Sequence, residues 1–463
     1  MKNMTLANIA KVCGGRLYPD DSPQKEAAGM VMDSRLVQKD YIFLASVGER
    51  VDGHNFIDEV FDKGALAVIC EKAPVPPKGP YILVESSLQA LKDIAAWYRE
   101  QLDIKVVGIT GSVGKTSTKE FISSVLARKY QVLKTEGNYN NEIGLPLTIL
   151  KITGEHEVAV LEMGISNFGE MHRLSKMAQP DICVITNIGQ CHLENLGSRQ
   201  GILKAKSEIF DFMKADGKVC INGDDDMLAT LQEIKGRKPI RFGFQQENDI
   251  TASDILSKGL FGSNCTIHLG EQSFSAEVPL PGSHMVLNAL AATAVGTLLD
   301  VAPAQIAEGI NAVKPLGGRS NIIRHEQYTV IDDCYNANPV SMKAALDLLS
   351  MADTRKVALL GDMGELGANE AMLHKNVGEY AIYSEADLLV CVGQLSRNMF
   401  EGAKAALAKG NASLIKHPAV LYFETRDALI SALPAILKDG DTILVKASHF
   451  MGFEHVVNAI QQQ

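Results

Sequence analysis

The stretch Ile104-Lys-Val-Val-Gly-Ile-Thr110-Gly-Ser-Val-Gly-Lys115-Thr-Ser-Thr118 decides the fold of this chain. Its apolar run at 106–109 is typical of a buried parallel strand, and apolar side chains at helical spacing predict a helix over 115–130. The small residues between them predict a turn that directs backbone N–H groups, and the positive end of the helix dipole, at one point. Such a point attracts phosphate, so this stretch predicts a phosphate-binding loop.

Lys115 and Thr116 give this loop its expected chemistry, because the Lys would reach the outer phosphates of a nucleotide and the Thr hydroxyl would bind Mg²⁺. The common pattern has four residues between its first Gly and Gly-Lys, whereas here Ile109 stands at that first position. An ordinary Gly-containing turn is the alternative, but the strand, the turn, the Lys-Thr pair and the helix all favour phosphate binding. The residues that we expect to hold phosphate are Thr110, Gly111, Ser112, Val113, Gly114, Lys115 and Thr116.

The composition excludes several classes of protein. A chain of 463 residues with 46% hydrophobic and 22% charged residues is typical of globular domains. The net charge of −10, without a basic run, argues against nucleic acid as a partner. The eight Cys are scattered singly and predict reduced thiols in a cytoplasmic protein. The N-terminus does not have the pattern of a signal peptide, and the longest apolar segment, 286–302, is too short to span a bilayer. We therefore expect no membrane insertion, and we expect a monomer.

The pattern along the chain predicts an α/β protein of three domains. Residues 1–84 predict a small N-terminal α/β domain. Residues 85–313 alternate strand and helix and include antiparallel hairpins at 250–280, which predicts a central P-loop ATPase-like domain on a parallel sheet. Two Gly and a Pro at 314–319 predict a linker. Residues 314–463 alternate strand and helix again, which predicts a Rossmann-like, doubly wound C-terminal domain.

Polar residues follow several expected strands, at the edge where open α/β sheets bind ligands. Glu162 falls near the end of a buried strand, where a carboxylate can hold Mg²⁺ directly or through water. His192 follows the next strand of the same sheet, although a lone His is more often packed or solvated. The Asn-rich segment 136–146 offers Asn138 and Asn141 as adaptable donors and acceptors for a polar substrate, or else it is a capped loop.

Other polar residues leave two interpretations open. Asn288 interrupts an Ala-rich helix, so it needs either a structural or a ligand partner. Lys206 lies on another expected helix, where exposure to solvent is the default for a Lys. In the N-terminal domain, Asp33-Ser34-Arg35 and Asp52-Gly53-His54 are consistent with ligand binding and also with the turns that Asp, Ser and Gly favour.

Together, these motifs resemble the Mur ligase family over nearly the whole chain. The segments that carry the resemblance are Thr110-Gly-Ser-Val-Gly-Lys-Thr116, Asn140-Asn141-Glu-Ile-Gly144-Leu-Pro146, Leu161-Glu162-Met-Gly164, Thr186-Asn-Ile-Gly189 with His192, Ala205-Lys206-Ser-Glu-Ile-Phe210, Tyr335-Asn336-Ala-Asn338-Pro339 and Gly361-Asp362-Met-Gly-Glu365-Leu-Gly367. The irregular phosphate loop is the form that this family uses. The order of the segments is most similar to the ligase of this family that adds D-alanyl-D-alanine to UDP-N-acetylmuramoyl-tripeptide in peptidoglycan precursor synthesis.

The resemblance implies an ATP-dependent ligase that forms an amide bond in two steps. ATP would phosphorylate the terminal carboxylate of the tripeptide, and the incoming amine would then displace phosphate from the acyl phosphate. By the same resemblance, Thr116 and Glu162 would hold one Mg²⁺, while His192 and a carbamylated Lys206 would lie near a second Mg²⁺. Lys115, Glu162, His192 and Lys206 would be the catalytic residues. The further residues that the resemblance assigns to ATP are Asn288, Arg319, Asp333 and Asn336.

The resemblance also gives each domain a role. Residues 1–84 would bind the UDP substrate, with Ser34 at a position that contacts the UDP end in a related ligase. Residues 85–313 would bind ATP, and residues 314–463 the amine substrate. In the C-terminal domain, Asp362 or Glu365 at a strand end would face the incoming ammonium group, unless this loop is only a tight turn. We assign Asn138 and Asn141 to substrate binding as well.

This chain departs from the family pattern after its last strand, where the usual Lys-Gly-Ser-Arg is replaced by Lys446-Ala447-Ser448-His449. Ala447 does not allow a Gly-only backbone angle and His449 is not a permanent cation, so the role of this segment stays open. The nearest alternative function is another Mur-type or folylpolyglutamate-type ligase that adds a single amino acid. A GTPase would need Asn-Lys-x-Asp, which the sequence lacks, and a nucleotide-binding scaffold would not need Lys206 or Glu162.

Overall fold

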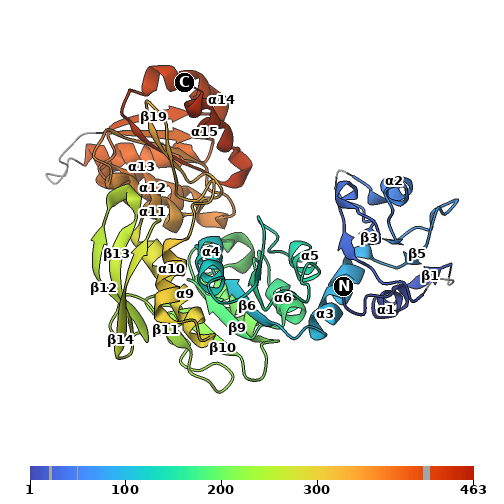
Figure 1. Ribbon diagram of the computed structural model, residues 1–463. Helices are drawn as coiled ribbons and strands as arrows, with labels where there is room; N and C mark the ends of the chain where they lie inside the picture. Colours follow the sequence, from blue (N-terminus) through green and yellow to red (C-terminus); the bar gives the residue numbers. More distant parts are fainter. Residues whose placement is uncertain (20–22, 50, 410–417, 463) are drawn as a thin grey trace.

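The computed structural model describes residues 1–19, 23–49, 51–409 and 418–462, and three sheets follow one another along the chain. In Figure 1 the central unit lies between the blue N-terminal unit on the right and the red C-terminal unit at the top left. This arrangement confirms the predicted α/β class with three sheet-based parts. In the described part of the chain, no helix has the length and apolar character needed to cross a membrane.

The N-terminal sheet has five strands in the order β1-β5-β4-β3-β2, with β1 antiparallel to β5 and the other pairs parallel. Its elements are α1 (Leu6–Val12), β1 (Arg16–Tyr18), β2 (Gly29–Val31), β3 (Tyr41–Leu44), α2 (Ile57–Asp62), β4 (Ala67–Cys70) and β5 (Tyr81–Leu83). Short 3-10 helices after β2 and β3 begin at Ser34 and Gly53. The preceding residues, Asp33 and Asp52, cap them, because each carboxylate accepts the N–H two residues later. The turn interpretation therefore accounts for these two Asp residues. Arg50, between them in the sequence, lies outside the described residues.

The central sheet has nine strands in the order β14-β13-β12-β11-β10-β9-β6-β8-β7. The pairs from β7 to β12 are parallel, and β12, β13 and β14 form the antiparallel hairpins predicted at 250–280. The strands are β6 (Lys105–Thr110), β7 (Val132–Lys134), β8 (Val158–Glu162), β9 (Ile182–Ile185), β10 (Lys218–Asn222), β11 (Ile240–Phe242), β12 (Ile250–Ser257), β13 (Ser263–Leu269) and β14 (Gln272–Val278).

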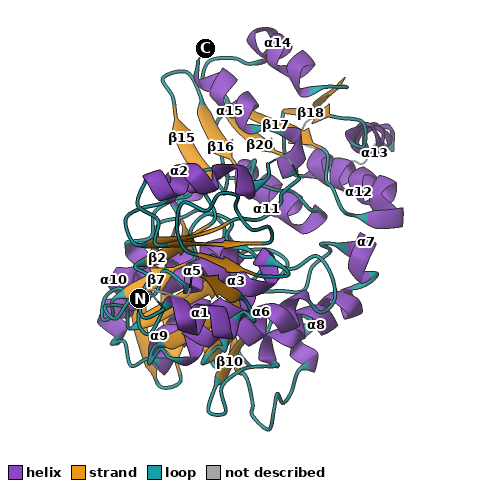
Figure 2. Ribbon diagram, turned by 90° about the vertical axis from the view of Figure 1, so that its right-hand side faces the viewer, coloured by secondary structure: helices purple, strands orange, loops and turns teal. Residues whose placement is uncertain are grey.

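Helices cover both faces of this sheet, as the fully buried apolar strands require. They are α3 (Ser87–Glu100), α4 (Lys115–Leu126), α5 (Gly144–Ile149), α6 (Glu170–Ala178), α7 (Leu193–Leu196), α8 (Arg199–Ser207), α9 (Ser283–Leu298) and α10 (Pro303–Asn311). Val106 of β6 faces the core that contains α3, whereas Val107 faces the core of α4 and α9. The first of these cores continues into the N-terminal unit through Ile42 and Ile69, so α3 packs on both units. Figure 2 shows α1, α3 and α6 close together in this region.

Two helices in the central unit differ from the sequence-based expectation. The helix expected over 115–130 ends at Leu126, and the helix expected from Ser198 ends at Ser207 before a 3-10 turn. In addition, α5 begins inside the segment that we interpreted as a polar loop. Oδ1 of Asn141 accepts the N–H groups of residues 143 and 144, which starts the helix, and Pro146 fits the first turn because N–H groups there lack helical partners.

The C-terminal sheet has six strands in the order β15-β16-β20-β17-β18-β19. The predicted alternation of strand and helix agrees with the parallel pairs, but it does not predict β15, which pairs antiparallel with β16 at the sheet edge. β15 is only four residues long and follows the linker directly, so it has no clear pattern. The elements are β15 (Asn321–Arg324), β16 (Thr329–Asp332), α11 (Pro339–Ser350), β17 (Lys356–Gly361), α12 (Glu370–Tyr383), β18 (Leu388–Val392), α13 (Ser396–Ala408), β19 (Ala419–Phe423), α14 (Arg426–Ile436), β20 (Thr442–Lys446) and α15 (Glu454–Gln461).

Candidate active site

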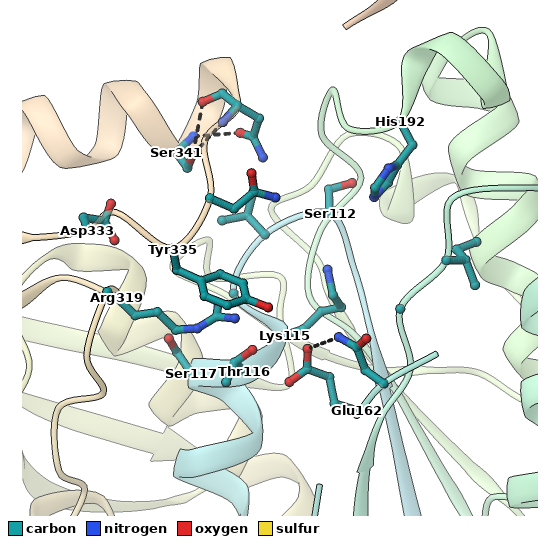
Figure 3. Close-up of a pocket in the computed structure, with 18 of the residues that line it drawn as sticks. Ser112, Lys115, Thr116, Ser117, Glu162, His192, Arg319, Asp333, Tyr335 and Ser341 are labelled. Carbon is teal, nitrogen blue, oxygen red and sulfur yellow. Dashed lines mark hydrogen bonds between the residues drawn. The ribbon is translucent and has the colours of Figure 1, made fainter. Parts of the chain in front are cut away.

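A cavity of about 680 Å³ lies between the central and C-terminal units. Its central wall contains the loop between β6 and α4, the end of β8 and, after β9, His192, as the sheet-edge argument predicts. Its other wall is built from the linker, the segment after β16 and the end of β20. Figure 3 shows Lys115, Thr116 and Glu162 on the central wall, with Arg319, Tyr335 and Asp333 across from them. Segments that are far apart in the sequence thus face one space.

The loop between β6 and α4 is shaped by glycine and by contacts to the end of β9. Gly114 is the left-handed N-cap of α4, with φ of +83°, and no side chain caps the first turn of that helix. The N–H groups of Ser112 and Val113 donate to the backbone and side-chain oxygens of Asn187, both at 3.0 Å. Nζ of Lys115 lies 2.9 Å from the carbonyl oxygen of Gly111, so the ammonium group sits over the loop. This geometry suits a phosphate-binding loop.

The space around Gly111 shows that this loop packs closely against Thr186. Its φ is +150°, and a Cβ added there would lie 1.9 Å from Oγ1 of Thr186 and 3.2 Å from its backbone N. We expect Gly111→Ala to lower the free energy of unfolding by about 2–3 kcal/mol, because overpacking and strain add. Urea denaturation of the variant checks this value. Gly154→Ala, where a Cβ meets nothing within 4 Å, is the matched control and should be near neutral. Equal stability of the two variants would contradict this view of the loop.

Two buried oxygens on the central wall lack partners among the described residues. Oε1 of Glu162 accepts a hydrogen bond from Asn140 at 2.8 Å, but its Oε2 has none, and neither has Oγ1 of Thr116. Glu162 and Thr116 are only 1% and 4% exposed, so each orphan oxygen costs free energy unless something binds it. A hard cation satisfies such oxygens. In the described part of the chain, no three His, Cys, Asp or Glu side chains form a metal site, so phosphate and water would complete the coordination of a Mg²⁺.

Lys206 and His192 both come from the segment that follows β9. Lys206 is 1% exposed at the end of α8, and it makes no hydrogen bond or ion pair with any described residue. Burial, with a smaller effect of the Lys115 ammonium, lowers the pKa of Lys206 to about 8. Its side chain is therefore buried, not on the surface. His192 lines the cavity in a left-handed conformation with φ of +51°.

His192 also contacts the C-terminal unit. Its Nδ1 lies 2.6 Å from a carboxylate oxygen of Glu365, although the ring N–H does not point along that line. We regard this as a close charge contact and not a well-aligned hydrogen bond. The imidazole lowers the pKa of the Glu365 carboxyl, which partial burial opposes. Glu365 therefore faces His192 of the central unit, although it is not itself among the residues that line the cavity.

The C-terminal wall is held by a buried Lys that the sequence analysis did not select. Nζ of Lys446, which is 2% exposed, lies 2.6 Å from a carboxylate oxygen of Asp333 and 2.9 Å from the carbonyl oxygen of Asn336. Asp333 also accepts the N–H of Ser320 at 2.8 Å. The predicted residues Arg319, Asp333 and Asn336 thus meet at one wall.

Eight predicted residues are not among those that line the cavity. Thr110, Gly111, Lys206 and Glu365 belong to segments described above, and the other four are Ser34, Asn138, Asn288 and Asp362. Asn288 is buried behind the loop and accepts a hydrogen bond from Thr118 at 2.9 Å, which gives it a structural partner. Ser34 lies in the N-terminal unit, and Asn138 is an exposed residue of the Asn-rich segment. Asp362 is 5% exposed and accepts the N–H groups of Leu395 and Ser396 at the start of α13. Among the residues proposed for substrate binding, Asn141 does line the cavity.

Several cavity residues escaped the sequence analysis. Asn140 orients Glu162, Tyr335 and Lys446 line the C-terminal wall, and His284 lies at the start of α9. Burial lowers the pKa of His284, which keeps its ring neutral near pH 7. The available signal was that Asn140 and Tyr335 stand in segments that carry the family resemblance and that Lys446 ends the last strand, β20. No such signal marked His284.

Sequence models of Mur ligases match three consecutive parts of the chain. The Mur ligase family catalytic domain matches residues 26–99, the Mur ligase middle domain matches 109–296, and the Mur ligase glutamate ligase domain matches 318–449. The chain is 38% identical over 462 residues to the UDP-N-acetylmuramoyl-tripeptide–D-alanyl-D-alanine ligase of Bacillus subtilis, covering 99% of this chain and 98% of that protein. The chain belongs to the Mur ligase family, as the motifs predicted.

Solved structures agree with this placement. A crystal structure of MurF from Acinetobacter baumannii superposes with a TM-score of 0.89 at 32% identity, covering 99% of each chain. MurF ligase from Thermotoga maritima, crystallised in complex with ADP, superposes with a TM-score of 0.78 at 30% identity, covering 94% of this chain and 97% of that one.

Proposed function

We propose that this chain is an ATP-dependent ligase that joins D-alanyl-D-alanine to UDP-N-acetylmuramoyl-tripeptide, a step of peptidoglycan precursor synthesis. The observation that carries the proposal is the likeness, over 99% of the chain, to a ligase of that name. The cavity supports it, because a phosphate-binding loop faces two orphan oxygens and a cationic wall. The reaction takes place in the cytoplasm, and the chain acts as a monomer.

ATP would lie in the cavity with its phosphates on the loop before α4. Negative charge builds up on the phosphoryl group during transfer, so cations and N–H donors must surround it. Lys115 and the N–H groups of the loop do this from the central wall, and Arg319 from the opposite wall. Thr116 and Glu162 would hold a Mg²⁺, which supplies further positive charge at the phosphates. A carboxylate oxygen of the tripeptide attacks the γ-phosphorus and ADP leaves, which gives an acyl phosphate. The amine of the second substrate then attacks the acyl carbon, loses a proton and displaces phosphate.

Lys206 would act as a carbamate near a second Mg²⁺, with His192 as a further contact. The neutral amine of Lys206 adds CO₂ and loses a proton, so that a side chain that is otherwise a buried cation becomes an anion. Two observations support this assignment: the family motif at Ala205-Lys206, and the burial of an amine that has no partner among the described residues. A pKa of about 8 leaves a share of the amine unprotonated near neutral pH, and that form reacts with CO₂.

We also assign one substrate to each unit of the chain. Residues 1–84, with Ser34, would bind the UDP end of the first substrate, residues 85–313 would bind ATP, and residues 314–463 would bind the dipeptide. Asn138 and Asn141 remain candidates for contacts with the peptide. Because the carboxylate of Asp362 caps α13, Glu365, which contacts the cavity residue His192, is the better placed of the two acids to meet an incoming ammonium group.

We expect the amine donor to be the dipeptide and not a single amino acid. Phosphate release from ATP, measured with the UDP-muramoyl tripeptide present, should rise most with D-alanyl-D-alanine. The comparison donors are D-alanine, diaminopimelate and glutamate, each at the same concentration. If one of these single amino acids is the best donor, the chain is another Mur-type or folylpolyglutamate-type ligase and the proposal fails.

A further inference from the structure

Arg319 is held by an aromatic ring. Its guanidinium carbon lies 4.0 Å from the centroid of the Tyr335 ring, which is the geometry of a cation–π contact. Within the described part of the chain, the Arg319 side chain makes no hydrogen bond and no ion pair. Figure 3 shows the two side chains together on the C-terminal wall, opposite Lys115 and Thr116.

The backbone fixes the distance between these two residues. The N–H of Tyr335 donates to the carbonyl of Gly318 at 3.0 Å, and the N–H of Gly318 donates to Asp332 at 2.7 Å. The N–H of Ser320 is held by Asp333 at 2.8 Å. Gly318 has φ of +72°, and a Cβ there would lie 3.1 Å from Cβ of Tyr335, so the two segments pack closely. The linker and the loop after β16 are therefore joined by several hydrogen bonds and pack closely.

Among the described residues, no carboxylate forms an ion pair with Arg319. The nearby acid, Asp333, is engaged by Lys446 at 2.6 Å. A carboxylate partner would neutralise the guanidinium and use its donors, whereas an aromatic face does neither and leaves the N–H groups in the plane free for phosphate oxygens. The Tyr335 ring is itself supported, because its centroid lies 5.7 Å from that of His449.

We propose that Tyr335 is a positioning residue for Arg319, and that its ring holds the guanidinium toward the phosphates of the nucleotide. An unsupported Arg side chain populates many rotamers, and fewer of them would place its donors on the transferring phosphoryl group. The proposal rests on the proposed function, in which Arg319 contacts ATP. It gives a role to Tyr335, which lines the same cavity.

A double-mutant cycle tests this inference. We expect Tyr335→Leu to lower kcat about 10-fold with little change in the KM for ATP, because the stack acts on the phosphoryl group in transfer. Tyr335→Phe keeps the ring face and should stay within about 3-fold of the parent. In an Arg319→Ala background, adding Tyr335→Leu should lower kcat by less than about 2-fold further. A loss of kcat of about 10-fold on adding Tyr335→Leu to Arg319→Ala would overturn the proposal, and so would a loss of kcat of about 10-fold in Tyr335→Phe.

A second measurement does not depend on turnover. In the full chain with ¹³C/¹⁵N-labelled arginine, the ring current of Tyr335 should shift the side-chain NMR signal of Arg319 upfield in the parent and in Tyr335→Phe. The shift should disappear in Tyr335→Leu. An Arg319 signal that is the same in all three proteins would refute the stack. If the parent shows no turnover with D-alanyl-D-alanine, the proposed function fails, and the NMR result still decides whether the ring holds the guanidinium.

Discussion

Lys115→Ala should lose about 10²-fold or more of the turnover number while the protein stays folded. The ammonium group of Lys115 lies over the loop before α4, 2.9 Å from the carbonyl of Gly111, and faces the cavity. In a closed site, removing one charge that stabilises the transferring phosphoryl group removes stabilisation that water cannot replace. Steady-state phosphate release with both substrates measures the loss.

Lys176→Ala is the matched control for this variant, because Lys176 is exposed on α6 and does not line the cavity. Its turnover should equal that of the parent. Both variants should show the parent's circular dichroism spectrum and thermal midpoint. Near-normal turnover of Lys115→Ala would contradict the assignment of this loop to phosphate binding. If Lys115→Ala does not show the folded spectrum, the same measurement is made on Lys115→Met, which keeps an apolar stem at this position.

Lys206→Ala should inactivate the enzyme to a similar extent, about 10²-fold or more, if a carbamate at this position helps to hold a Mg²⁺. The buried amine has no partner among the described residues, and Ala leaves space where the carbamate head would lie. A small carboxylate such as formate or acetate in the buffer should therefore restore part of the turnover. The readout is phosphate release as a function of the added carboxylate.

Lys204→Ala is the control for Lys206→Ala, since Lys204 is an exposed residue on the same helix. It should behave as the parent and gain nothing from added carboxylate. Carbon-13 NMR after equilibration with labelled bicarbonate should show a carbamate signal in the parent and in Lys204→Ala but not in Lys206→Ala. An unmodified Lys206 amine in an active complex with ATP and Mg²⁺ would refute the carbamate.

The sequence predicted most of what depends on local pattern. The apolar run of β6, the glycines of the loop and the Lys-Thr pair lie within a few residues, so strand, turn and helix could be derived together. The position of Glu162 at the end of β8 followed from the same kind of pattern, because parallel strands bring their carboxyl ends to one edge. The edge strand β15 was missed because four residues next to a linker carry no such pattern.

The C-terminal wall of the cavity could not be predicted in this way. Lys446 meets Asp333 only because β20 lies beside β16 in the sheet, although the two strands are far apart in the sequence. The stack of Arg319 on Tyr335 depends on the left-handed turn at Gly318. Asp362 shows the reverse case, since a carboxylate at a strand end looked like a ligand group but serves the start of α13. Long-range pairing decided each of these contacts.

Family resemblance and structure together also bear on the segment Lys446-Ala447-Ser448-His449. Ala447 is fully buried and does not have a positive φ, so the structure does not require glycine at this position. Oγ of Ser448 accepts the N–H of Gly364 at 2.9 Å, which joins the end of β20 to the loop after β17. The departure from the usual pattern is therefore compatible with the fold of the C-terminal unit.

The central claim is that the tripeptide carboxylate is activated by phosphorylation before the amine attacks. Transfer of oxygen-18 tests it most directly: the UDP-muramoyl tripeptide is labelled in its terminal carboxylate and incubated with ATP, Mg²⁺ and D-alanyl-D-alanine. An acyl phosphate that is opened by the amine leaves one carboxylate oxygen on the phosphate, so the released phosphate should carry one oxygen-18 for each amide bond formed. Released phosphate without the label would contradict the account.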